Sequence, residues 1–182
     1  MNIKPLRLIP GDCIGIVAPA SPERECGRVE RGVRYLEKLG YRVMIGKHVE
    51  KRNGYLAGTD AQRAADINKM FADKRVKAIF STRGGYGTPR ILPLLDYKLI
   101  ARNPKIFVGF SDITALNLAL LEKAKLISFN GALPGVDFWK DEINPFTEEY
   151  FWRVLTSPEP LGKITSDKRI ALKKLHSGNA EG

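Results

Sequence analysis

A serine stands at the predicted junction of a strand and a helix, in the segment Gly109-Phe-Ser-Asp-Ile-Thr114. An apolar run leads directly into Ser111, and a helical pattern begins at once after it. This is the arrangement of a nucleophile elbow, in which a sharp turn projects the serine oxygen from the end of a strand. The backbone N–H of Asp112 would then lie at the positive end of the helix dipole, where an oxyanion is stabilised.

A simpler interpretation of the same segment stays open. Ser111 or Asp112 can cap an ordinary helix, because short polar side chains accept hydrogen bonds from the first free N–H groups. The segment also departs from the Gly-x-Ser-x-Gly pattern of nucleophile elbows, since position 113 is isoleucine. The two interpretations differ in one observable: an elbow requires unusual backbone torsions at Ser111, and a cap does not.

A second segment, Arg83-Gly-Gly-Tyr-Gly87, follows another predicted buried strand. Its glycines allow close approach of the backbone and leave N–H donors available to an anion. The segment matches neither the dinucleotide-binding fingerprint nor the phosphate-binding P-loop, because no Gly-Lys-Ser or Gly-Lys-Thr follows it. It either cradles an anion, completes an oxyanion hole, or forms only a tight turn between a strand and a helix.

Spacing alone identifies no general base for Ser111. A serine hydroxyl is a weak nucleophile until a base takes its proton, and that base needs an orienting carboxylate. The histidines are His48, near the end of the second predicted strand, and His176, in the C-terminal tail, and neither has a carboxylate partner that spacing identifies. The cysteines, Cys13 and Cys26, are too few for a zinc site, and Cys13 is expected to be buried. We therefore expect no metal and no cofactor.

The elements that must position these residues alternate along the chain. The first apolar run is continuous rather than alternating, which indicates a strand buried on both faces. Alternation of such strands with helices predicts an α/β fold, a mostly parallel sheet flanked by helices. Strands are predicted at 12–20, 41–45, 76–81, 104–109 and 126–130, and helices at 26–39, 61–71, 89–95, 112–124 and 146–155.

Ligands of parallel sheets bind at the carboxyl ends of the strands, near the point where the strand order reverses. The loops 18–22, 82–88 and 109–112 each follow a predicted strand, so we expect them to line one crevice. Three parts of the chain are predicted: an α/β nucleophile domain over 1–135, a helical extension over 136–162, and a linker over 163–182. The last part is basic, then small and polar, which is linker composition.

Composition excludes several classes of protein. The chain has 182 residues, of which 43% are hydrophobic and 27% charged, as in ordinary globular proteins. It has neither the ~18 consecutive apolar residues of a membrane helix nor a signal-peptide core, so we expect a cytoplasmic protein with no membrane partner. The net charge of +10 lies mostly in the first 100 residues. These positive residues are scattered without aromatic residues to stack bases, so we expect no nucleic acid partner.

Five segments occur together in one order. They are Gly11-Asp12 with Ile16-Val-Ala-Pro-Ala-Ser21; Tyr55-Leu-Ala-Gly-Thr-Asp60 with Arg63-Ala-Ala-Asp-Ile-Asn68; Phe80-Ser-Thr-Arg-Gly-Gly-Tyr-Gly-Thr88; Pro104-Lys-Ile-Phe-Val-Gly-Phe-Ser-Asp-Ile-Thr-Ala-Leu116; and Gly178-Asn-Ala-Glu-Gly182. In this order they resemble the L,D-carboxypeptidase (muramoyltetrapeptide carboxypeptidase) family of serine peptidases, which includes the microcin C7 self-immunity group. The resemblance covers essentially the whole chain.

The resemblance implies a glutaminase-I-type, flavodoxin-like α/β domain that acts without a metal. The implied substrate is a murein tetrapeptide of cell-wall recycling, from which terminal D-alanine is cleaved; the microcin group cleaves a peptidyl or aminoacyl nucleotide instead. The implied site residues are Ser111 as nucleophile, the backbone N–H groups of Asp112 and of Gly84 or Gly85 as oxyanion hole, and Arg83 and Tyr86 as substrate-binding residues.

The resemblance also implies a Ser-Glu-His triad, whose Glu and His lie in a C-terminal domain, and a homodimer of the full-length protein. Neither His176 nor Glu181 matches the triad positions. We therefore expect a chain that is truncated and poorly active alone, and that exposes an apolar face where the further domain docks. Candidate residues for that face are Phe138, Trp139, Phe151 and Trp152. The alternative is a non-catalytic α/β domain that binds an anionic peptide or nucleotide over Gly84–Gly87.

Overall fold

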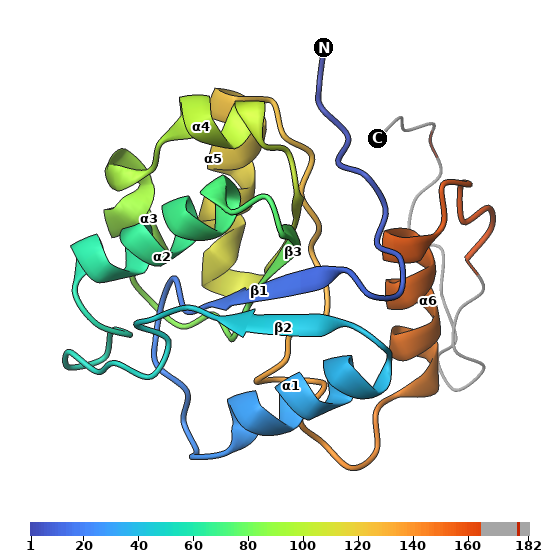
Figure 1. Ribbon diagram of the computed structural model, residues 1–182, viewed down its shortest axis with the longest axis horizontal. Helices are drawn as coiled ribbons and strands as arrows, with labels where there is room; N and C mark the ends of the chain where they lie inside the picture. Colours follow the sequence, from blue (N-terminus) through green and yellow to red (C-terminus); the bar gives the residue numbers. More distant parts are fainter. Residues whose placement is uncertain (165–177, 179–182) are drawn as a thin grey trace.

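The computed structural model describes residues 1–164 and 178, and its centre is a parallel sheet (Figure 1). Its strands are β1 (Cys13–Val17), β2 (Arg42–Ile45), β3 (Val76–Ser81) and β4 (Ile106–Val108), in the order β2-β1-β3-β4. All three neighbouring pairs are parallel, which confirms the predicted α/β class. β2 lies on one side of β1, and β3 lies on the other. The strand order therefore reverses between β1 and β3, which is where parallel sheets of this kind bind their ligands.

Helices cover both faces of this sheet (Figure 1). On one face lie α2, α4 and α5, whose buried side chains share one hydrophobic cluster; on the other lie α1 and α6, which share a second. Their bounds are α1 (Arg28–Lys38), α2 (Asp60–Ala72), α3 (Thr88–Ile91), α4 (Tyr97–Arg102), α5 (Thr114–Ala124) and α6 (Pro145–Thr156), with 3-10 turns at Leu92–Leu94 and Ser111–Ile113.

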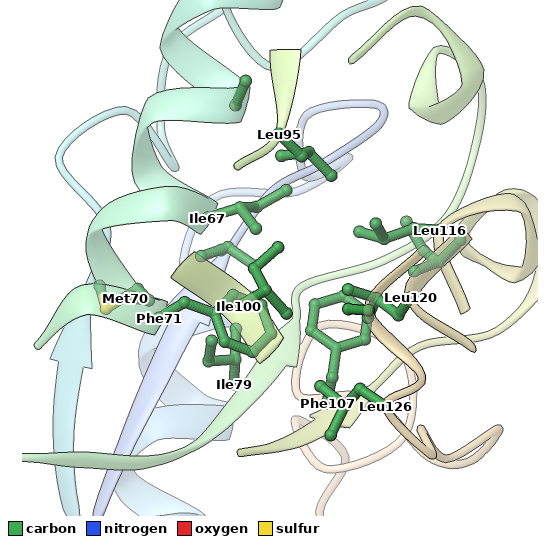
Figure 2. Close-up of a cluster of buried hydrophobic side chains, with 14 of the residues drawn as sticks. Ile67, Met70, Phe71, Ile79, Leu95, Ile100, Phe107, Leu116, Leu120 and Leu126 are labelled. Atoms are coloured by element: carbon green, nitrogen blue, oxygen red, sulfur yellow. The ribbon is translucent and has the colours of Figure 1, made fainter. Parts of the chain in front are cut away.

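The first cluster joins α2, α4 and α5 to one face of the sheet (Figure 2). Alternate strand residues such as Ile79 and Phe107 point into it, because successive side chains of a strand face opposite sides. Phe71 of α2 stacks on Phe107 with ring centroids 6.4 Å apart. Cys13 is buried in this cluster, as expected. The ends of β3 and β4 are thereby fixed relative to α5, which begins beside Ser111.

The second cluster contradicts the expectation that the aromatic residues Phe138, Phe151 and Trp152 lie on an exposed apolar face. Phe138 is only 1% exposed, and Trp152 donates a hydrogen bond from Nε1 to the Tyr35 hydroxyl at 2.7 Å. Phe151 packs edge-on against Phe80 of the sheet. Phe138, Phe151 and Trp152 therefore pack together on the α1 and α6 side of the sheet and do not form a bare apolar face. Trp139 is partly buried, and the Arg28 guanidinium lies over its ring, 4.0 Å from the ring centroid.

The structure differs from the predictions most at residues 126–130 and at α4. The predicted strand 126–130 is absent as a strand: only single parallel bridges form, from Leu126 to Ile3 and from Phe129 to Val108. The short helix α4 was not predicted; its N-terminus is capped by Asp96, whose carboxylate accepts from Leu99 N–H. The N-terminus of α2 is capped by Thr59, in a capping box with Gln62.

None of the helices described between residues 1 and 164 is long and apolar enough to cross a membrane. Most of the predicted linker 163–182, including His176 and Glu181, lies outside the described residues. The domain boundaries at 135 and 162 remain predictions, although Leu155 of α6 shares a hydrophobic cluster with the sheet.

Candidate active site

Ser111 adopts the backbone conformation of an elbow. Its φ is +63°, in the left-handed region that side-chain-bearing residues rarely occupy, and its side chain is exposed. Neither Ser111 nor Asp112 caps the helix that follows, because no side-chain cap is present at the 3-10 turn Ser111–Ile113 or at α5. The capping interpretation is therefore wrong. Strain of this kind costs ~1–3 kcal/mol and persists only where the surrounding packing imposes it.

Gly109, Ile113 and Asn117 fix the turn at Ser111. A side chain at Gly109 would place its Cβ 2.2 Å from Cγ2 of Ile113, so only glycine allows the strand end to approach the helix this closely. Ile113, the residue that departs from the nucleophile-elbow pattern, is fully buried and anchors the turn in the first cluster. Asn117 of α5 reaches back and donates from Nδ2 to the Gly109 carbonyl at 2.9 Å.

The loops 18–22, 82–88 and 109–112 meet at one place, as predicted. A Cβ on Gly84 would lie 3.0 Å from Cβ and 3.3 Å from Oγ of Ser111, so this glycine is in direct contact with the serine. A Cβ on Gly85 would lie 2.3 Å from Oγ of Ser21, and the Tyr86 N–H donates to the same oxygen at 3.1 Å. Ser21, at the end of the first loop, is a positioning residue that sequence reasoning missed. Its place in the quoted first segment was the available signal.

Backbone donors beside Ser111 are free. In the described part of the chain, nothing accepts a hydrogen bond from the N–H groups of Gly84, Gly85 or Asp112. The N–H groups of Tyr86 and Thr88, by contrast, are both engaged. An oxyanion hole requires donors that are fixed by the fold yet unpaired before substrate arrives. This arrangement can stabilise negative charge on an oxygen atom that lies beside Ser111.

The side chains predicted to bind substrate differ in exposure. Tyr86 is 72% exposed beside the crevice. Arg83 is half-buried and donates from Nη1 to the Pro22 carbonyl at 3.0 Å, which ties the glycine-rich loop to the first loop. Burial lowers the pKa of Arg83, and its guanidinium stays charged all the same. The substrate-binding roles of both residues remain predictions.

His48 has a carboxylate partner that the sequence did not reveal. Its Nδ1 lies 2.9 Å from Oδ1 of the buried Asp66, and its backbone N–H donates to Oδ2 at 2.8 Å. Gly46 permits this approach, since a Cβ there would lie 2.6 Å from Asp66 Oδ2. The expectation that His48 lacks an orienting carboxylate is therefore wrong. The pair joins the loop after β2 to α2, and no hydrogen bond among the described residues links it to Ser111.

Glu23 directly follows the first of the three loops, 18–22. Its carboxylate oxygen Oε2 is buried, has no hydrogen-bond partner among the described residues, and rests against Gly135. Burial raises the pKa of this carboxyl above its usual value. Within residues 1–164, His, Cys, Asp and Glu side chains do not gather in threes that could hold a metal ion.

A pH dependence of stability follows from Glu23. The folded chain binds the proton of the Glu23 carboxyl more tightly than the unfolded chain, so protonation of Glu23 stabilises the fold. This stabilisation is fully present below the usual pKa of 4.5 and is lost as the pH rises through the raised pKa of the folded chain. We expect the unfolding free energy of the wild type to fall over that window relative to Glu23→Gln, measured by urea unfolding at several pH values. Glu122→Gln, whose side chain is 83% exposed, is the control. Parallel profiles for wild type and Glu23→Gln would contradict this assignment.

Comparison with known proteins decides the family. The model of the LD-carboxypeptidase N-terminal domain matches residues 14–131, which contain the glycine-rich segment Arg83–Gly87 and Ser111. The chain belongs to the LD-carboxypeptidase family. A probable murein peptide carboxypeptidase of Bacillus subtilis is 38% identical over 183 residues, covering 100% of this chain and 56% of that protein. The microcin C7 self-immunity protein MccF of Escherichia coli is 35% identical over 80% of this chain and 43% of its own length.

Solved structures of family members share the fold. An MccF-like protein from Bacillus anthracis superimposes with a TM-score of 0.81 at 34% identity, covering 85% of this chain and 47% of that one. A muramoyltetrapeptide carboxypeptidase from Oxalobacter formigenes gives a TM-score of 0.73 at 34% identity, covering 80% and 48%. The chain thus spans about half the length of the relatives it matches.

Proposed function

We propose that this chain is the nucleophile-bearing half of a serine peptidase of the L,D-carboxypeptidase type, which releases terminal D-alanine from murein tetrapeptide in cell-wall recycling. The observation that carries the proposal is the left-handed Ser111 in contact with Gly84, beside unpaired backbone N–H groups. Membership of the family and the names of its murein carboxypeptidase members support the substrate class.

The proposed reaction is acyl transfer through Ser111. The serine oxygen attacks the carbonyl carbon of the terminal peptide bond, and its proton passes to a base. The negative oxygen that forms accepts hydrogen bonds from the N–H groups of Asp112 and of Gly84 or Gly85. The C–N bond breaks, D-alanine leaves with a proton on its nitrogen, and water hydrolyses the ester to free the serine.

The base is proposed to come from outside residues 1–164. Within that range no Asp, Glu or His side chain is hydrogen-bonded to Ser111. Relatives are about twice as long as this chain, so their further half is the proposed source. A joined protein tests this: the 182-residue chain followed by the part of the Bacillus subtilis relative that it does not cover. D-alanine release from the tetrapeptide by the joined protein is the expected result.

Gly84→Ala is expected to lower kcat of the joined protein by about 10²-fold, because the added methyl group pushes the loop from Ser111 and displaces an oxyanion donor. The matched control is Gly131→Ala, where an added Cβ also meets its nearest neighbour, the Phe151 ring, at 3.0 Å. The control should keep the wild-type kcat. Equal turnover of both variants would remove Gly84 from the site.

A binding function is the second candidate. It rests on the family members solved with nucleotide ligands, such as MccF in complex with adenosine monophosphate, at 34% identity. Calorimetry with adenosine monophosphate and with murein tetrapeptide separates the candidates. Tight binding of the nucleotide by the joined protein, with no D-alanine release from the tetrapeptide, would favour the binding function over the peptidase.

A further inference from the structure

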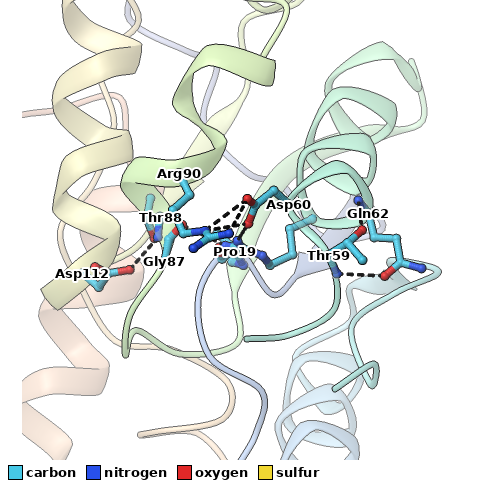
Figure 3. Close-up of polar contacts among 9 residues, drawn as sticks. Pro19, Thr59, Asp60, Gln62, Gly87, Thr88, Arg90 and Asp112 are labelled. Carbon is cyan, nitrogen blue, oxygen red and sulfur yellow. Dashed lines mark hydrogen bonds and ion pairs between the residues drawn. The ribbon is translucent and has the colours of Figure 1, made fainter. Parts of the chain in front are cut away.

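One peptide group of the glycine-rich loop is held at both ends by opposite charges (Figure 3). The Gly87 carbonyl accepts a hydrogen bond from Nη1 of Arg63 at 2.9 Å. The Thr88 N–H donates to Oδ2 of Asp112, also at 2.9 Å. Because this C=O and this N–H belong to the same planar peptide unit, the two bonds together fix its orientation. Hydrogen bonds to charged groups are stronger than bonds between neutral groups.

Arg63 and Asp112, which hold this peptide group, are called the clamp below. Its cationic end, Arg63, is buried in the core. Arg63 of α2 is 2% exposed, and its guanidinium also donates to the Pro19 carbonyl and to Asp60. Arg90, just after the loop, binds the same Asp60 carboxylate, with Nη2 2.9 Å from Oδ2. The guanidinium of Arg63 therefore joins the loop after β1, the glycine-rich loop after β3 and the first turn of α2.

The loop is closely packed at this point. Gly87 has φ +113°, and a Cβ on it would lie 2.4 Å from Cδ2 of Leu56. On the other side of Gly87, the Tyr86 N–H is held by Ser21. Residues 86, 87 and 88 are thus anchored one after another by Ser21, Arg63 and Asp112. The N–H groups of Gly84 and Gly85, the next residues towards β3, have no acceptor within the described part of the chain.

We propose that the carboxylate of Asp112 and the guanidinium of Arg63 are positioning residues for the oxyanion hole. Asp112 then acts twice: its backbone N–H is one donor, and its side chain ties the Ser111 turn to the loop that carries the other donor. The two donors consequently move as one unit. The link between this clamp and turnover rests on the proposed function, whereas the clamp itself does not.

The first test measures loop order in the 182-residue chain, without any activity. In ¹⁵N relaxation, we expect the Gly84 and Gly85 amides to be rigid, with order parameters near ~0.85, in the wild type and in Asp112→Asn, whose amide oxygen can still accept from Thr88. Asp112→Ala should lower them towards ~0.6. The control is Asp96→Ala, which removes an equally long 2.9 Å carboxylate bond from Leu99 N–H at α4. Unchanged order parameters in Asp112→Ala would overturn the clamp.

The second test separates positioning from stability. In the joined protein, Asp112→Ala should lower kcat by about 10²-fold with KM nearly unchanged, because oxyanion donors act in the transition state. Asp112→Asn should restore most of kcat, and Asp96→Ala should match the wild type. A loss of loop order with wild-type kcat would overturn the positioning role. Loop disorder in Asp112→Ala together with no D-alanine release by the wild type would leave the clamp standing and contradict the proposed function.

Discussion

Replacing Ser111 by alanine is expected to lower D-alanine release by the joined protein by a factor of about 10⁶ in kcat. The serine oxygen forms the covalent bond to the substrate, so its removal leaves only the binding and oxyanion contributions, worth ~10³–10⁴ over water. Release of D-alanine from the murein tetrapeptide, followed by chromatography, measures the effect.

The matched control is Ser157→Ala. Ser157 lies at the end of α6, away from the crevice, where its Oγ accepts from Glu159 N–H. Its loss should leave kcat and KM unchanged. A Ser111→Ala protein that keeps more than about a hundredth of the wild-type kcat would exclude the serine as nucleophile, since loss of a single oxyanion donor already costs ~10²–10³.

The second large effect concerns the 182-residue chain by itself. We expect its turnover to fall below that of the joined protein by up to about 10⁶-fold, because a serine without a base remains a weak nucleophile. In residues 1–164 the histidine present, His48, is bonded to Asp66 and not to Ser111. The same assay checks this. D-alanine release by the 182-residue chain at the rate of the joined protein would mean that the chain contains its own base.

Much of the fold follows from local patterns in the sequence. Continuous apolar runs predict β1, β3 and β4, because strands buried on both faces need no polar alternation. The fate of residues 138–152 does not follow from such patterns. Trp152 and Glu148 bind Tyr35, more than 100 residues earlier, so the burial of α6 depends on a contact that no local pattern contains.

In the candidate site too, some features follow from the sequence and others depend on tertiary contacts. The meeting of Ser111 with Gly84 follows from the parallel sheet, because both residues come directly after strands whose carboxyl ends lie at one edge. The bonds that hold them there are specific to the tertiary structure. Asp112 reaches Thr88 across 24 residues, and Asp66 reaches His48 across 18, through a space that Gly46 leaves open. Sequence spacing therefore locates Ser111 and the N–H groups beside it, but not the side chains that bond to these loops.

The most direct test of Ser111 as the nucleophile is covalent labelling of the joined protein with a fluorophosphonate, followed by peptide mapping in a mass spectrometer. The account predicts one phosphonyl group per chain on the peptide that contains Ser111, and none in Ser111→Ala. A label on another residue, such as Ser21, which accepts a hydrogen bond from the glycine-rich loop, would contradict it. So would an absence of label in a protein that releases D-alanine.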